Sequence, residues 1–262
     1  MATLVRDGVR VVYQDVGSGE PAIVFVHGWT CDRSHFAPQV ARFAPAHRCV
    51  SVDLRGHGES DAPEQAYTID GFADDVAWVC DQLGVKNALL VGHSMGGAIV
   101  LALAARRQDL ARAVAMLDPA ILFPPEVKAL AAQLAGAFAG PGGMETVKQF
   151  GAGQFFLPSS DPTLKDRVLA AMAKTPQHVV ASAFTAITKF DSEAALRSAK
   201  APLLYVGAEP AIAEITKLPE LAPGTIVART AGSGHFHQLE VPDQVNAMLS
   251  RFLAINTTAA VM

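Results

Sequence analysis

A serine lies at the centre of the segment Gly92-His93-Ser94-Met95-Gly96-Gly97. The preceding residues 88–91 are wholly apolar, as in a strand buried on both faces, and a helical run follows over 98–105. Gly-x-Ser-x-Gly between a strand and a helix is typical of a nucleophile elbow, a strained turn that exposes the serine hydroxyl. Glycine at both flanking positions lets the strand and the helix pass closely, since a Cβ would clash there. The segment therefore predicts Ser94 as a nucleophile.

A serine hydroxyl is a poor nucleophile at neutral pH and needs a base within hydrogen-bond reach. Among the eight histidines, His235 has the most suitable place. It follows Gly234 in a loop between the last predicted strand, 225–229, and a helix predicted to begin at Pro242. Loops at this edge of an open α/β sheet form ligand sites. We predict His235 as the base, whereas His27 and His57 are expected to stabilise turns.

Short apolar runs alternate with amphipathic helices along most of the chain. The predicted strands are residues 3–6, 9–16, 22–26, 49–52, 88–91, 113–117, 203–206 and 225–229. Such alternation indicates an α/β fold with a mostly parallel sheet of about eight strands and flanking helices. Between residues 119 and 200 only amphipathic helices are predicted. We therefore expect a core made of residues 1–118 and 201–262, with residues 119–200 inserted as a helical cap.

Four segments together resemble the α/β-hydrolase superfamily. They are His27-Gly28-Trp29, the segment Asp53-Leu54-Arg55-Gly56-His57-Gly58-Glu59-Ser60, the serine motif, and Ser233-Gly234-His235-Phe236. The resemblance spans about residues 20–253 and places the family's base at His235. It implies that the backbone N–H groups of Trp29 and Met95 form an oxyanion hole. It also implies the α/β-hydrolase fold and a serine hydrolase that cleaves a carboxylic ester, a lactone or an amide through an acyl-enzyme on Ser94.

The acid that orients the base departs from the family pattern. Family members commonly carry it in a Gly-x-x-Asp turn after the next-to-last strand, but here that turn is Gly207-Ala208-Glu209-Pro210. Asp118, directly after the strand 113–117, matches the place used by some members. Glu209 lies on the usual loop, one residue early. We favour Asp118, because a strand end holds a carboxylate more rigidly than a loop does; Glu209 is the alternative.

Composition and charge exclude several function classes. The chain has 262 residues, with 21 Lys and Arg against 25 Asp and Glu, a net charge of −4, and no basic cluster for nucleic acid or an anionic membrane. Three scattered cysteines without a CxxC pair argue against a disulfide framework and a zinc site, so we expect no metal and no cofactor. The charged first ten residues lack the apolar core of a signal peptide, so a cytoplasmic protein is expected. The uncharged stretch 87–105 contains too many polar residues and glycines to span a membrane.

The phenylalanines of the insertion indicate an apolar pocket between the cap and the sheet. We therefore expect a small, largely apolar substrate as the partner, bound by a monomer or a homodimer. Two alternatives keep the same fold. One is cofactor-free haloperoxidase or perhydrolase chemistry on the same residues. The other is a ligand-binding receptor without turnover, which the displaced acid motif would favour.

Overall fold

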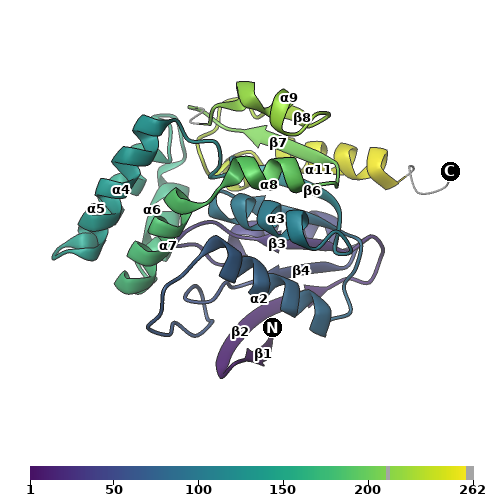
Figure 1. Cartoon of the computed structure of the whole chain (residues 1–262), viewed down its shortest axis with the longest axis horizontal. Coiled ribbons are helices and arrows are strands. Elements are labelled where there is room, and N and C mark those ends of the chain that lie inside the picture. Colours follow the sequence, from purple (N-terminus) through teal and green to yellow (C-terminus); the bar gives the residue numbers. More distant parts are fainter. Residues whose placement is uncertain (211–212, 258–262) are drawn as a thin grey trace.

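An eight-stranded sheet forms the centre of the computed structural model, which describes residues 1–210 and 213–257 (Figure 1). The strand order is β1-β2-β4-β3-β5-β6-β7-β8. The pairs β1–β2 and β2–β4 are antiparallel and all others are parallel, which confirms the predicted mostly parallel sheet. The strands are β1 Ala2–Arg6, β2 Val9–Val16, β3 Ile23–Val26, β4 Cys49–Val52, β5 Ala88–His93, β6 Ala111–Leu117, β7 Leu203–Gly207 and β8 Ile226–Arg229.

Helices cover both faces of the sheet. The helices α2 (Ile69–Gln82), α3 (Met95–Arg106) and α8 (Ser192–Ser198) lie on one face, in front in Figure 1. The helices α1 (Ala37–Phe43) and α11 (Pro242–Thr257) contact each other and pack on the other face. Each central strand sends alternate side chains to the two cores: Leu90 packs toward α2 and α3, and Leu89 toward α1 and α11. Burial on both faces explains why the central strands are apolar throughout.

Helices without strands occupy the segment between β6 and β7. They are α4 Pro125–Ala139, α5 Gly143–Gln154, α6 Pro162–Met172, α7 Gln177–Lys189 and α8. In Figure 1, α4 to α7 gather at one end of the molecule, at left. The sequence pattern did not predict α5, because its Gly151 and Gly153 lower intrinsic helix propensity and its packing decides instead. The division of the chain into a core and a cap stays a prediction.

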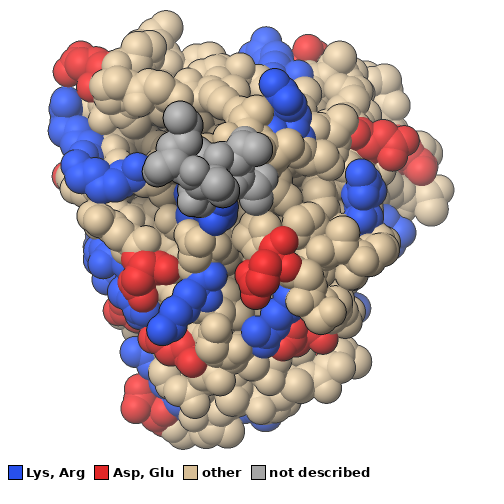
Figure 2. Space-filling view, turned by 90° about the vertical axis from the view of Figure 1, so that its right-hand side faces the viewer, with Lys and Arg blue, Asp and Glu red and all other residues tan. Residues whose placement is uncertain are grey.

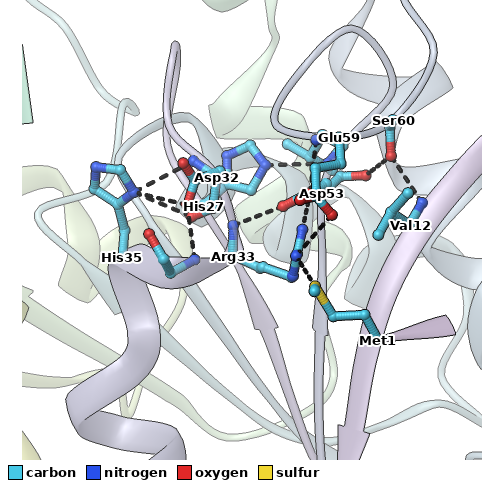
Figure 3. A network of polar contacts seen from close by, with 11 residues as sticks. Met1, Val12, His27, Asp32, Arg33, His35, Asp53, Glu59 and Ser60 are labelled. Atoms are coloured by element: carbon cyan, nitrogen blue, oxygen red, sulfur yellow. Dashed lines mark hydrogen bonds and ion pairs between the residues drawn. The ribbon is translucent and has the colours of Figure 1, made fainter. Parts of the chain in front are cut away.

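A closed network of polar groups fastens the loops that follow β3 and β4 (Figure 3). We call His27, Arg33, Asp53, Glu59 and Ser60 the Asp53 cluster. Asp53 is fully buried; it accepts from the backbone N–H of Arg33 at 2.8 Å and of Glu59 at 2.9 Å, and it pairs with the Arg33 guanidinium. The Ser60 hydroxyl donates to the Asp53 carbonyl at 2.7 Å. The cluster thereby satisfies a carboxylate that burial alone would destabilise.

His27 completes this cluster with both ring nitrogens occupied. Its Nε2 accepts from the Leu54 N–H at 3.0 Å, so the proton sits on Nδ1, which donates to the Gly28 carbonyl at 2.8 Å. The ring of His57 lies 5.4 Å away. Burial lowers the pKa of His27 to about 4, and burial together with His27 lowers the pKa of His57 to about 3. Both histidines are neutral parts of turns, as the sequence analysis expected.

The surface carries charges of both signs. On the face opposite the inserted helices, Figure 2 shows Lys and Arg side chains interspersed with Asp and Glu. Within residues 1–210 and 213–257, none of the helices combines the length and the apolar character that a bilayer crossing requires.

Candidate active site

Ser94 is the single residue that joins β5 to α3, and it adopts a left-handed backbone conformation with φ 54° and ψ −118°. Neighbouring strand ends fix this conformation: the Ser94 N–H donates to the Leu117 carbonyl at 2.9 Å. A Cβ on Gly92 would overlap the Gly96 carbonyl, and one on Gly96 would overlap the Val26 carbonyl. The two glycines therefore allow the close approach that the strained turn requires.

Asp118 and His235 form a hydrogen-bonded pair. Asp118 directly follows β6, and its Oδ2 lies 2.6 Å from His235 Nδ1. Because a carboxylate only accepts, the His235 proton sits on Nδ1 and leaves Nε2 as an acceptor. The other oxygen of Asp118 accepts from the Ala208 N–H at 3.2 Å. Burial would raise the pKa of Asp118, but the hydrogen bond and charge of His235 outweigh it, and the pKa lies below its ordinary value.

Glu209, the alternative acid, lies on the surface. Its side chain is exposed, and the carboxylate makes no hydrogen bond or ion pair within the described part of the chain. Its backbone N–H donates to the Ser233 carbonyl at 3.2 Å. The geometry thus brings Asp118, and not Glu209, to the imidazole.

Ser94 and His235 line the same cavity without a preformed hydrogen bond between them. Within residues 1–210 and 213–257, the Ser94 hydroxyl has no hydrogen-bond partner. The hydroxyl turns about the single Cα–Cβ bond, and nucleophile–base hydrogen bonds are commonly long before substrate binds. The His235 imidazole is thus held in one orientation, and the Ser94 hydroxyl, which can rotate, lines the same cavity.

Two backbone N–H groups beside Ser94 also lack acceptors among the described residues: those of Trp29 and Met95. Met95 is the first residue of α3, so no earlier helical turn can accept from it. The loop before Trp29 touches the elbow, since a Cβ on Gly28 would lie 3.1 Å from the Ser94 Cβ. Two free donors next to a nucleophile can bind an oxyanion.

His93 connects the elbow to the loop of the base, a contact that the sequence analysis missed. Its Nε2 donates to the His235 carbonyl at 2.9 Å, and the two rings lie 4.6 Å apart. The other ring nitrogen lies 3.0 Å from where a Cβ on Gly28 would be. Only its position beside Ser94 could have drawn attention to it. His93 is buried, so it fixes the relative positions of three loops.

The inserted helices also hold the base. Phe155, which follows α5, accepts from the His235 N–H at 2.9 Å and stacks its ring on the imidazole at 4.8 Å between centroids. A second tie lies nearby, where the Ser160 hydroxyl donates to the Glu240 carboxylate at 2.5 Å. On the other side of the site, the Trp29 indole donates to the Val180 carbonyl of α7 at 2.9 Å. The loops of His235 and Trp29 are thus hydrogen-bonded to the helices between β6 and β7.

A cavity of about 250 Å³ opens beside Ser94, His235 and Asp118. Much of its wall is apolar: Trp29, Phe123, Leu130, Leu134, Phe150, Phe184 and Ile187. Among the described residues that line the cavity, none is Lys or Arg, and Asp118 is the acidic one. Nor do the described residues contain a group of three or more His, Cys, Asp or Glu side chains that could hold a metal ion. The site can therefore act on uncharged, largely apolar molecules.

Comparison with known proteins assigns the fold. Residues 21–165 match the family model described as alpha/beta hydrolase fold. The chain is also 30% identical over 258 residues to 2-(acetamidomethylene)succinate hydrolase of Mesorhizobium japonicum, covering 92% of this chain and 90% of that one. The chain belongs to the alpha/beta hydrolase family. This confirms the resemblance found in the sequence.

Other relatives of this alpha/beta hydrolase differ in what their names describe. The enol-lactonase of Burkholderia xenovorans LB400 superposes with a TM-score of 0.85 at 26% identity, over 97% of this chain and 100% of that one. The bifunctional esterase/perhydrolase DCH of Acinetobacter calcoaceticus is 39% identical over 122 residues, 46% of this chain and 44% of that one. Esterases and lactonases are therefore among its relatives.

Proposed function

We propose that the protein is a serine hydrolase that cleaves a carboxylic ester, or a lactone or amide, of a small and largely apolar substrate. The observation that carries this proposal is the Asp118–His235 pair beside the Ser94 elbow, next to two N–H groups without acceptors. Esterase and lactonase relatives support it. No cofactor is required for this reaction.

In the first half-reaction, Ser94 Oγ attacks the substrate carbonyl carbon and its proton passes to His235 Nε2. Asp118 keeps the imidazole in the tautomer that can accept this proton, and it stabilises the imidazolium. The Trp29 and Met95 N–H groups bind the oxygen that becomes negative. As the tetrahedral intermediate collapses, the carbon–oxygen bond of an ester breaks and His235 returns the proton to the leaving alcohol.

In the second half-reaction, water replaces the alcohol. His235 takes a proton from water, the hydroxide attacks the acyl-Ser94 carbonyl, and the proton returns to Ser94 Oγ as the acid leaves. In a lactone the alcohol and the acid are one molecule, so the product is a hydroxy acid. The apolar wall supplies binding through burial, roughly 25 cal/mol for each Å² of apolar surface removed from water.

A fluorophosphonate probe with p-nitrophenyl acetate tests the proposal. The probe should label Ser94, and Ser94→Ala should abolish labelling and lower ester turnover by at least about 10⁴-fold. Ser198→Ala is the matched control, because Ser198 lies exposed on α8, away from the cavity. Esterase activity that persists in the Ser94→Ala protein would refute the assignment.

The relative named a bifunctional esterase/perhydrolase favours one alternative, in which hydrogen peroxide replaces water in the second half-reaction. Peroxide would then attack acyl-Ser94 and release a peracid. Monochlorodimedone bromination in the presence of peroxide and an ester would measure it. A receptor function on the same cavity would instead show ligand binding without product release.

A further inference from the structure

Two polar side chains that the proposed reaction does not use line the cavity, those of the exposed Gln154 and of the buried Tyr205. Tyr205 lies in β7, is 2% exposed and lines the cavity. Its ring extends along the strand toward the site, because a Cβ on Gly207 would lie 3.1 Å from Tyr205 Cε1 and 3.6 Å from the hydroxyl oxygen. The outer end of the side chain, with the hydroxyl, therefore lies beside Gly207, the last residue of β7.

This hydroxyl makes no hydrogen bond within the described part of the chain, and it is not one of the fully buried atoms without a partner, so it is accessible from the cavity that Tyr205 lines. Buried tyrosine hydroxyls usually find a partner, since an unpaired one costs stability. Tyr67 follows the common pattern, because its hydroxyl donates to the Pro63 carbonyl at 2.8 Å. The Tyr205 hydroxyl is thus available to form a hydrogen bond with a ligand.

The position of Tyr205 places this donor beside the catalytic pair. Tyr205 pairs with Met116 in β6, and the Asp118 N–H donates to the Val206 carbonyl at 2.7 Å, so the two residues lie on adjoining strand ends. Burial, with the charge of Asp118, raises the pKa of Tyr205. The phenol keeps its proton and can donate a hydrogen bond.

The surroundings of the hydroxyl select the chemistry of what it can bind. No Lys or Arg of the described residues lines the cavity, and the charge of Asp118 acts on Tyr205 more strongly than that of Arg229 in β8, so a carboxylate or phosphate at this point is disfavoured. The Asp118 carboxylate is already hydrogen-bonded to His235, so a cation is not favoured either. A neutral oxygen acceptor remains.

We propose that Tyr205 binds a second, uncharged oxygen of the substrate, separate from the carbonyl that Ser94 attacks. The substrate is accordingly an ester or lactone that also carries a ketone, ether or hydroxyl oxygen. This inference rests on the proposed function. It makes Tyr205 a specificity residue: its hydrogen bond selects among substrates and takes no part in proton transfer.

Matched esters test the inference. In p-nitrophenyl methoxyacetate, 3-methoxypropanoate and 4-methoxybutanoate, one CH₂ of the butanoate, pentanoate and hexanoate esters is replaced by an ether oxygen. For each pair, the ratio of kcat/KM for the ether ester to that for the alkyl ester is compared between the wild type and Tyr205→Phe. For at least one oxygen position the ratio should fall about five- to tenfold in Tyr205→Phe, mostly through KM. Tyr13→Phe, in β2 and outside the cavity, should leave every ratio as in the wild type.

Equal ratios in the wild type and Tyr205→Phe at all three oxygen positions would overturn the inference. The thermal midpoint of Tyr205→Phe should not fall, because the substitution removes only an unpaired hydroxyl. A clear fall would reveal a protein partner for that hydroxyl and would also overturn the inference.

A binding measurement separates this outcome from failure of the proposed function. The intact ether and alkyl esters are titrated into Ser94→Ala and into Ser94→Ala/Tyr205→Phe by calorimetry. The preference for the ether ester should again fall about five- to tenfold with the second substitution. If Ser94→Ala retains turnover, the serine mechanism fails, whereas an unchanged binding preference contradicts only the assignment to Tyr205.

Discussion

Two groups of polar residues lie at the same edge of the sheet and differ in how fully their hydrogen bonds are satisfied. In the Asp53 cluster, both oxygens of Asp53 and both ring nitrogens of His27 have protein partners. In the cavity, the hydroxyls of Ser94 and Tyr205 have none among the described residues. Saturated polar groups stabilise the fold, whereas open polar groups that line a cavity are available to a ligand. The first group thus serves the fold, and the second is the proposed site of the reaction.

The largest expected effect is a loss of activity on substitution at the cavity. Asp118→Asn should lower kcat about 10⁴-fold, because the amide cannot hold His235 in the tautomer that accepts the Ser94 proton. Glu209→Gln is the matched control and should leave kcat near the wild-type value. Steady-state kinetics with p-nitrophenyl acetate measure both. Losses of similar size in the two variants would mean that the Asp118–His235 bond does not orient the base.

Substitutions in the Asp53 cluster should instead change the stability of the fold. Asp53→Ala leaves the backbone N–H groups of Arg33 and Glu59 without an acceptor and the Arg33 guanidinium with only the exposed Glu59 carboxylate, and should lower the free energy of unfolding by about 3–5 kcal/mol. Urea denaturation measures this loss, and kcat per folded molecule should change little. Asp61→Asn, at an exposed ion pair with Arg10, should be nearly neutral by comparison. A folded Asp53→Ala protein of normal stability but without activity would erase the distinction between the groups.

Acid should unfold the protein partly through two buried neutral histidines, His27 of the Asp53 cluster and the neighbouring His57. The folded-state pKa values of His27 and His57, about 4 and about 3, lie below the 6.5 of an unfolded chain. The unfolded state therefore binds more protons between these values, and stability falls as pH drops from 6.5 toward 4 by roughly 1.4 kcal/mol per pH unit for each histidine. Urea midpoints from pH 7 to pH 4 measure the slope. His57→Gln should flatten it, and an unchanged slope would argue against a neutral buried His57.

The smallest expected effect concerns His93, which joins parts of the open group. His93→Phe removes the hydrogen bond to the His235 carbonyl and should lower kcat about ten- to a hundredfold with little change in KM. His93→Gln retains an N–H donor and should recover part of the loss. A thermal melt of each variant distinguishes misplacement of the base from unfolding. If His93→Phe and His93→Gln were equally impaired, shape and not the hydrogen bond would be responsible.

Sequence patterns predicted the parts of this molecule that depend on local chemistry. The elbow at Ser94 follows from glycines two residues before and two residues after the serine and from the apolar strand that precedes them. The position of Asp118 at a strand end could also be predicted, because β6 has a clear apolar pattern. The hydrogen bonds that join these parts could not be predicted. The bonds from His93 and Phe155 to His235 span 142 and 80 residues and depend on how loops meet after the sheet has formed.

The helix α5 shows that tertiary packing can also override local sequence propensity. Its glycines argue against a helix, yet packing against α4 and α6 forms one, and its end carries Phe155. Tyr205 was indistinguishable in the sequence from an ordinary core residue of β7. Its importance arises only from a missing partner, which no one-dimensional pattern contains.

The bond between Phe155 and His235 makes the base dependent on the position of α5. Any motion that moves the end of α5 away from the sheet to admit a molecule would break that hydrogen bond and separate the stacked rings. The imidazole would then lose two of the contacts that align it.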